Sequence, residues 1–203
     1  LLQDHLPQKS DSWIDIKSRW NNNDPSGWDW IQDGKAFIWV SEKEGWRKIY
    51  QIDLKGNEKL ITKADYDIIN LDFLDPKGEI IYFTASPSNA TQKYLYSVST
   101  KGGSPKRLTP ASFEGTCDYD ISKDGKIAIF SFSNRAELKQ DAIIELPTHR
   151  TVVDFEVKRE KNVSDGIAEF FKVKTTEGVE LDGWMVKPLD FDPNKKYPVV
   201  FMV

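Results

Sequence analysis

The chain has 203 residues, with 28 Lys and Arg against 32 Asp and Glu, a formal net charge of −4 and a mean hydropathy of −0.54. This composition excludes collagen-like, low-complexity and disordered classes of protein. No apolar run approaches the ~20 residues that a membrane helix needs, and the mild acidity argues against a nucleic-acid-binding protein.

Most segments alternate apolar and polar residues with a period of two, and this pattern predicts an all-β fold. Segment 136–146 comes nearest to a helix, but its second half has the alternation of a strand, so we expect no helix of ten or more residues. Turn signals that contain glycine separate the predicted strands, because glycine adopts positive φ without steric cost. The strands are expected at 36–41, 47–53, 79–86, 93–99, 126–133 and 141–146.

Three markers recur along the chain in the same register. The turn glycines Gly34, Gly78 and Gly125 lie 44 and 47 residues apart. The strand motif Ile-Tyr-Gln-Ile at 49–52 returns as Leu-Tyr-Ser-Val at 95–98 and Ile-Ile-Glu-Leu at 143–146, which are 46 and 48 residues apart. The motif Leu-Ile-Thr at 60–62 returns as Arg-Leu-Thr at 107–109, which is 47 residues later. A period of ~40–50 residues with four antiparallel strands is typical of β-propeller blades, although regular hairpins give any all-β chain some self-similarity. We expect a tail with the last strand or strands of a preceding blade at 1–27, then three blades at 28–62, 69–109 and 117–154.

Three blades leave two end faces uncovered, since closed propellers have about 4–8 blades. We therefore expect a partial β-propeller that belongs to a longer chain or needs partners to cover these faces. We also expect this chain to expose an apolar blade face near its first or last unit and so to self-associate.

The pattern changes after the third expected blade. Residues 155–168 are charged and irregular, and we interpret them as a linker. Residues 169–188 predict a hairpin that turns at 176–178, and 189–198 predict a polar loop. The continuous apolar run 199–203 is typical of a strand buried on both faces, as in the parallel sheet of an α/β domain.

The candidate functional residues each have a structural alternative. Cys117 is the only cysteine, so it forms no internal disulfide and is expected to be a buried core thiol. Ser41 and Glu42 could bind an amine, but we favour a role in the hairpin turn. Five tryptophans could form a surface for a peptide or carbohydrate, but we favour packing between blades. They are Trp20, Trp28, Trp30, Trp39 and Trp46.

We also interpret several acidic residues and one histidine as structural rather than functional. Asp65, Asp67, Asp118 and Asp120 are expected to face solvent at blade edges, where charge discourages strand pairing. His149 is expected to be a turn residue. The loop 190–201 starts like a calcium loop but lacks the required glycine and glutamate, so calcium is rejected. Asn89 and Asn162 stand in glycosylation sequons that can arise by chance.

Two segments resemble a known family. Residues 39–50, with the pattern Trp-x-Ser-Glu-x-x-Gly-Trp-Arg-x-Ile-Tyr, resemble the propeller of bacterial dipeptidyl peptidase IV-type enzymes of the prolyl oligopeptidase family of serine peptidases. Residues 178–203 resemble the start of that family's α/β-hydrolase domain. The resemblance implies the C-terminal blades of the propeller and the beginning of the catalytic domain at 169–203.

The resemblance implies that the parent protein is a serine exopeptidase that releases N-terminal dipeptides, with proline preferred at the second position. The propeller would then gate and position peptide substrates, and the fragment alone would be inactive. The alternative is a non-catalytic propeller module that binds a protein or peptide. The resemblance further implies a homodimeric parent in the periplasm or outside the cell, and no cofactor.

No catalytic, substrate-binding or metal-binding residue of the family can be assigned to this sequence. The Gly-x-Ser-x-Gly motif of the nucleophile is absent, and the two histidines, His5 and His149, lie outside the hydrolase part. The tryptophan- and tyrosine-flanked glutamates that bind the substrate amine in the family have no counterpart here.

Overall fold

The computed structural model describes residues 28–63, 65–75, 77–87, 91–134, 139–155, 168–188 and 190–201. These residues form two compact units, one up to residue 155 and the other from residue 168. The expected tail at 1–27, with Trp20 and His5, lies outside the described residues, as do both sequon asparagines.

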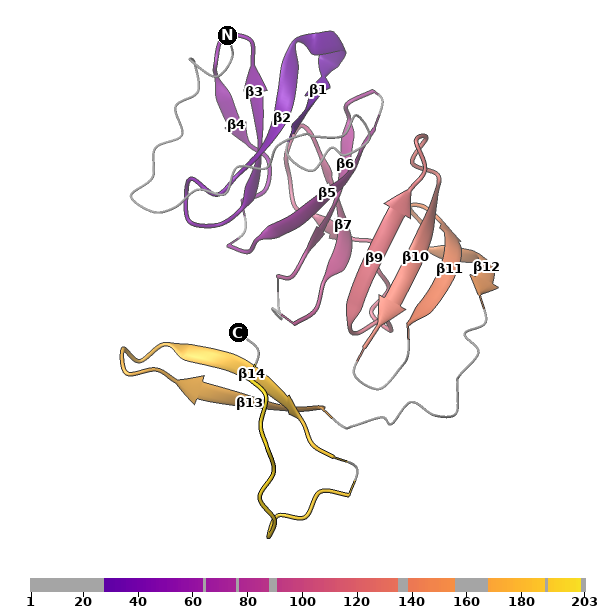
Figure 1. Cartoon of the computed structure of the whole chain (residues 1–203). Helices are drawn as coiled ribbons and strands as arrows, with labels where there is room; N and C mark the ends of the chain where they lie inside the picture. Colours follow the sequence, from indigo (N-terminus) through magenta and orange to yellow (C-terminus); the bar gives the residue numbers. More distant parts are fainter. Residues whose placement is uncertain are drawn as a thin grey trace. The chain divides into compact units, whose positions relative to one another are not determined.

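Three four-stranded antiparallel sheets make up the first unit, and each follows the order of the chain (Figure 1). The only helical element among the described residues is the short 3-10 turn η1 (Gln32–Gly34). The all-β, propeller-like fold predicted from the alternation is therefore confirmed. The first sheet contains β1 (Trp28–Ile31), β2 (Ala36–Ser41), β3 (Lys48–Asp53) and β4 (Glu58–Leu60); the second β5 (Ile68–Leu74), β6 (Ile80–Ala85), β7 (Tyr94–Ser99) and β8 (Lys106–Arg107); the third β9 (Thr116–Ile121), β10 (Ile127–Ser133), β11 (Gln140–Glu145) and β12 (Arg150–Phe155).

The turn glycines between the first two strands also bring the sheets together. Gly78 and Gly125 have φ of +67° and +70°, which disfavours any residue with a Cβ. A Cβ on Gly78 would lie 2.9 Å from the Cβ of Ile31 in the first sheet, and one on Gly125 would lie 2.5 Å from the Phe73 ring in the second. Glycine is therefore required at these positions both by the turn and by close contact with the preceding sheet.

One apolar cluster joins the three sheets. One face of β2 is buried: its side chains Ala36, Ile38 and Val40 are 1, 0 and 6 % exposed, and Ile31 of β1 belongs to the same cluster. Phe83 of the second sheet and Phe130 of the third belong to the same cluster. Burying each such side chain contributes roughly 1.5–3 kcal/mol, so packing between sheets stabilises this unit.

The face of the third sheet that points away from this cluster is open to solvent. Ile127 and Ile129 are 47 and 50 % exposed, and Val153 on β12 is 42 % exposed. The last sheet thus exposes an apolar face, as the sequence led us to expect; self-association through it stays a prediction.

The second unit contains a hairpin and a loop. β13 (Ala168–Lys174) pairs with β14 (Glu180–Val186), and Gly178 takes φ +86° in the turn. The hairpin predicted at 169–188 is thus present. Gly183 lies opposite Phe171, whose ring occupies the space that a Cβ would need. Whether residues 169–203 begin an α/β-hydrolase domain stays a prediction.

The strand predicted at 199–203 is absent from the described residues. Residues 199–201 pair with no described strand, and 202–203 lie outside the description. An apolar run becomes a strand only where a neighbouring strand supplies hydrogen-bond partners, and the hairpin β13–β14 does not pair with it.

Candidate functional site

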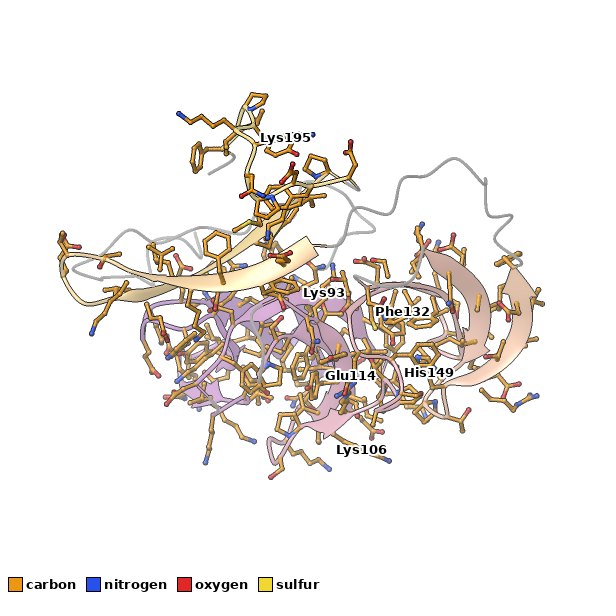
Figure 2. The ribbon with its side chains drawn as sticks, turned by 90° about the horizontal axis from the view of Figure 1, so that it is seen from below. Lys93, Lys106, Glu114, Phe132, His149 and Lys195 are labelled. Atoms are coloured by element: carbon orange, nitrogen blue, oxygen red, sulfur yellow. The ribbon has the colours of Figure 1, made fainter. Side chains whose placement is uncertain are left out.

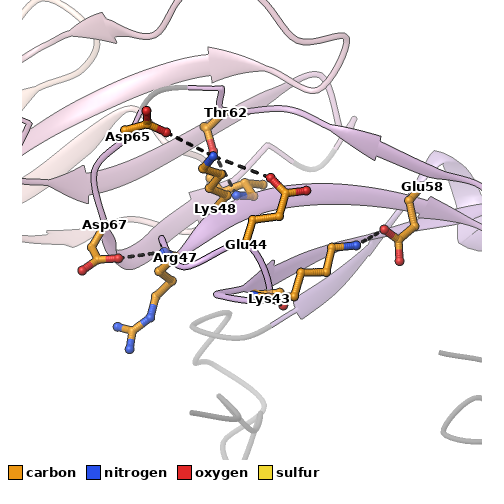
Figure 3. A network of polar contacts seen from close by, with 10 residues as sticks. Lys43, Glu44, Arg47, Lys48, Glu58, Thr62, Asp65 and Asp67 are labelled. Atoms are coloured by element: carbon orange, nitrogen blue, oxygen red, sulfur yellow. Dashed lines mark hydrogen bonds and ion pairs between the residues drawn. The ribbon is translucent and has the colours of Figure 1, made fainter. Parts of the chain in front are cut away.

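Charged side chains gather where the first sheet meets the second. The loop between β2 and β3 approaches the connection between β4 and β5 (Figure 3). The ammonium of Lys48, a largely buried residue, lies 3.4 Å from Asp65 Oδ1 and 3.6 Å from Glu44 Oε2. Lys43 pairs with Glu58 beside it. Because these charges neutralise one another locally, the cluster is suited to holding the junction together.

Main-chain hydrogen bonds complete this junction. The Arg47 N–H donates to Asp67 Oδ1 over 2.7 Å, and Arg47 O accepts the N–H of Ile68 over 2.9 Å. Asp65 and Asp67 were expected to face solvent at a blade edge. Both are exposed, as predicted, but they lie in the connection before β5 rather than on an edge strand, and they contact residues of the first sheet.

The turn of the β2–β3 hairpin uses Ser41 and Glu42. The N–H of Gly45 donates to Glu42 O over 2.8 Å, and the N–H of Lys43 donates to Ser41 Oγ over 3.3 Å. The Glu42 carboxylate lies 3.8 Å from the Arg47 guanidinium. These contacts support the turn role favoured for Ser41 and Glu42. Trp46 differs from expectation, since it is 44 % exposed and therefore not buried between sheets.

The second and third sheets meet through the same arrangement. The N–H of Lys93 donates to Gly115 O over 3.2 Å, and Lys93 O accepts the N–H of Cys117 over 3.1 Å. The Lys93 ammonium pairs with Asp118 of β9. Lys93 can be followed in Figure 2, where it is labelled. Asp118 was also expected to face solvent, and although exposed it contributes an ion pair between sheets.

Asp72 is a functional candidate that the sequence interpretation missed. It lies at an irregularity of β5, between Leu71 and Phe73, where the pairing with β6 shifts register. Such bulges redirect side chains. The residue is only partly buried as a whole, but its Oδ2 atom is buried without a hydrogen-bond partner in the described structure. Burial raises the pKa of the Asp72 carboxyl to about 8, against the opposing effects of Thr84 and Lys93. An Asp inside the apolar run 68–74 was the available sequence signal.

A hydrogen-bond chain ends at His149. The Leu95 N–H donates to Thr109 Oγ1, this oxygen lies 2.8 Å from the Tyr119 hydroxyl, and that hydroxyl lies 2.9 Å from His149 Nε2. Burial lowers the pKa of His149, so a neutral imidazole can accept a hydrogen bond from the Tyr119 hydroxyl through Nε2. His149 lies in the turn before β12, as predicted, and packs against Phe130.

The tryptophans of the first sheet contact one another edge to face. Trp28 and Trp30 have ring centroids 6.3 Å apart, Trp30 lies 5.5 Å from Phe37, and Phe37 lies 6.2 Å from Trp39. This ladder crosses β1 and β2 on one face, which agrees with packing on the sheet. The alternative of a surface for peptide or carbohydrate is not tested.

Cys117 is fully buried and free, as predicted for a core thiol. Burial raises the pKa of its thiol to about 12, which makes it a poor nucleophile near neutral pH. In the described ranges, no group of three or more His, Cys, Asp or Glu could hold a metal ion. No helix of the described residues has the length and apolar character required to cross a membrane.

The chemistry offered by the described residues is therefore limited. His149 is hydrogen-bonded to Tyr119, and the Cys117 thiol stays neutral near neutral pH. Neither residue therefore forms part of a nucleophile–base pair. The first strands of the second and third sheets do offer carboxyl groups, at Asp72, Asp118 and Asp120, and burial favours the neutral form of Asp72 by raising its pKa.

Comparison with known proteins identifies the family. The sequence model of the "Dipeptidyl peptidase IV (DPP IV) N-terminal region" matches residues 5–137. The chain belongs to the dipeptidyl peptidase IV N-terminal region family. The resemblance found in residues 39–50 is thereby confirmed.

Curated relatives extend the similarity along the chain. The dipeptidyl peptidase 4 of Trichophyton tonsurans is 26 % identical over 202 residues, which cover 95 % of this chain and 25 % of the relative. The probable dipeptidyl peptidase 4 of Aspergillus fumigatus is 25 % identical over 172 residues, covering 81 and 22 %. The chain thus spans about a quarter of the length of these relatives.

Solved structures show the same fold. The crystal structure of Porphyromonas gingivalis dipeptidyl peptidase 4 matches with a TM-score of 0.66 and 27 % identity, over 83 % of this chain and 24 % of that one. A putative dipeptidyl aminopeptidase IV from Bacteroides ovatus matches with a TM-score of 0.67 at 18 % identity, over 82 and 26 %, which supports the fold alone.

Proposed function

We propose that this chain is the propeller part of a dipeptidyl peptidase IV-like serine peptidase that releases N-terminal dipeptides, with a preference for proline at the second position. The observation that carries the proposal is the family match over residues 5–137, together with relatives that are dipeptidyl peptidases. In this proposal the triad lies in parts of the parent protein other than these 203 residues, and the sheets gate and position the peptide.

The first strands of the sheets fit a role in positioning peptides. β5 and β9 contact each other at one edge of their sheets, and β9 carries the exposed carboxylates of Asp118 and Asp120. The substrate of an exopeptidase that works from the N-terminus bears a free α-ammonium group. Carboxylates along the path of such a substrate attract it over a range that salt shortens to about 8–10 Å. We therefore propose that these strands favour entry of the cationic end of a peptide.

A substitution in the whole protein tests this role. Asp120 is exposed on β9, and we expect Asp120→Asn to raise KM for a glycyl-prolyl reporter about two- to fivefold at low salt, with kcat unchanged. The effect should disappear at high salt. Asp154→Asn is the matched control, because Asp154 is exposed on β12, the last strand of its sheet, and should leave KM unchanged.

Two further measurements examine the reaction class. A serine-directed fluorophosphonate should inactivate the whole protein, whereas the 203-residue chain alone should neither react with it nor cleave the reporter. A whole protein that binds peptides without cleaving them would refute the peptidase proposal and favour the non-catalytic module. The homodimeric state and the periplasmic or extracellular location stay predictions.

A further inference from the structure

The first strand of the second sheet contains an extra acidic residue. β1 pairs with β2, and β9 pairs with β10, in continuous register, whereas the pairing of β5 with β6 shifts between Leu71 and Phe73. Asp72 is the residue that this shift inserts, so it has no counterpart in β1 or β9. Bulges of this kind redirect a side chain and are often built into functional sites.

Two buried oxygens near this bulge have no hydrogen-bond partner among the described residues. They are Asp72 Oδ2 and, on the neighbouring strand β6, Thr84 Oγ1, whose residue is 1 % exposed. The Thr84 hydroxyl is close enough to lower the pKa of Asp72, but burial has the larger and opposite effect. A buried carboxylate oxygen without a donor is costly when the group is charged, and the neutral acid avoids most of this cost.

A lysine is shared by Asp72 and a second carboxyl group. The Lys93 ammonium attracts the Asp72 carboxylate, and the carboxylate of Asp118, on β9 of the third sheet, repels it. Within the described ranges the ammonium forms an ion pair with Asp118 and none with Asp72. Tyr119 of β9 also acts on this group, but burial raises its pKa and keeps it neutral. One cation thus serves two carboxyl groups from neighbouring sheets.

We propose that Asp72, Lys93 and Asp118 form a proton-controlled switch at the junction of the second and third sheets. While Asp72 holds its proton, Lys93 pairs with Asp118 and links the two sheets. When the O–H bond of the Asp72 carboxyl breaks and the proton passes to water, the buried carboxylate draws the Lys93 ammonium away from Asp118. The junction then loses an ion pair. The switch does not depend on the proposed peptidase activity.

The main chain of Lys93 gives this switch a structural readout. The N–H of Lys93 donates to Gly115 O over 3.2 Å, and Lys93 O accepts the N–H of Cys117 over 3.1 Å. The junction of the first and second sheets has the same main-chain bond, because the Ile68 N–H donates to Arg47 O over 2.9 Å. Since β1 pairs in continuous register and has no inserted acid, the Ile68 amide is an internal control.

The proton on Asp72 can be followed by NMR. The carboxyl ¹³C signal in the 203-residue chain, assigned by its loss in Asp72→Asn, should titrate with a midpoint near the pKa of about 8 that burial produces. Asp118→Asn should lower this midpoint by about 1 pH unit, because a repelling charge is lost and Lys93 is released toward Asp72. Lys93→Met should raise it by about the same amount. Asp120→Asn is the matched control, since Asp120 is exposed on the same strand, and it should leave the midpoint unchanged.

The titration has two outcomes that contradict the switch. A midpoint below about pH 6 would show that Asp72 is charged at neutral pH. A midpoint that Asp118→Asn leaves unchanged or raises would show that the two carboxyl groups do not share Lys93. Either result would overturn the proposal.

Hydrogen exchange tests the structural consequence. After correction for hydroxide catalysis, protection of the Cys117 amide should fall about threefold or more between about pH 6 and 9, because the junction loses an ion pair. The Cys117 thiol itself stays neutral in this range, since burial raises its pKa to about 12. Protection of the Ile68 amide should stay nearly constant, and Asp72→Asn should abolish the fall at Cys117. An equal fall at both amides, or a fall that persists in Asp72→Asn, would refute the switch.

Discussion

The hydroxyl of Thr109 joins two sheets, and its removal should have a measurable cost. β8 ends at Arg107, so the Leu95 amide lies beyond the last main-chain partner that β8 offers. Thr109 Oγ1 accepts this N–H over 2.8 Å and lies 2.8 Å from the Tyr119 hydroxyl of the third sheet. Thr109 is 2 % exposed. Valine has nearly the same shape but no hydroxyl, so Thr109→Val removes both bonds.

The expected loss of stability follows from these two contacts. A buried N–H left without an acceptor costs about 1–3 kcal/mol, and the lost bond to Tyr119 contributes roughly 0.5–1.5 kcal/mol. Thr109→Val should therefore lower the free energy of unfolding by about 2–4 kcal/mol. Thr62→Val is the matched control, because the buried Thr62 hydroxyl accepts the Ile49 N–H over 2.9 Å at the equivalent position of the first sheet.

Urea denaturation of the 203-residue chain, followed by circular dichroism, measures both variants. Thr62→Val should cost about 1–3 kcal/mol, and Thr109→Val should cost about 1 kcal/mol more. In a double-mutant cycle with Tyr119→Phe the two changes should be less than additive, since they remove one shared bond. The reasoning fails if Thr109→Val costs less than about 0.5 kcal/mol, or no more than Thr62→Val.

Three further predictions concern His149, Gly125 and Cys117. Burial lowers the pKa of His149 in the folded chain, so below about pH 6.5 the unfolded chain binds a proton more readily than the folded chain does. The free energy of unfolding should therefore fall as the pH decreases through this range. His149→Asn, which tolerates φ +59°, should flatten the loss of stability between pH 7 and 5 in denaturation series; an unchanged slope contradicts the assignment. Gly125→Ala should cost at least about 1 kcal/mol more than Gly56→Ala in urea denaturation, because both positions strain alanine but only Gly125 meets the Phe73 ring; equal costs would show that the close contact does not matter. The Cys117 thiol should resist an aromatic disulfide reagent at pH 8 in the native chain and react fully in urea, and fast native labelling would show that it is accessible.

The strands that the alternation predicted are those with a regular period. β2, β3, β6 and β7 begin and end within one residue of the expected ranges. The alternation did not predict β5, because irregularities at Ile68/Asn70 and Leu71/Phe73 break its period of two. The run 199–203 has the composition of a strand, but a strand also requires a partner that the described residues do not supply.

The ion-pair partners of the charged residues were the part that the sequence did not predict. Asp65 and Asp118 are exposed, as expected, but composition carries no information about partners distant in sequence. Their lysines, Lys48 and Lys93, are 17 and 25 residues away and come close only when neighbouring sheets pack. Asp72 was missed for the same reason, since its raised pKa depends on burial between strands.

The sequence by itself determined the strand period, the turn glycines and their recurrence, and with them the all-β fold and the family. These are local properties, because alternation and positive φ act on a few neighbouring residues. Only the tertiary structure decided that Thr109, Tyr119 and His149 form one hydrogen-bond chain and that Ile129 is exposed while Ile38 is buried. Those outcomes depend on which sheet lies against which, and burial and hydrogen-bond partners are properties of that packing rather than of the local sequence.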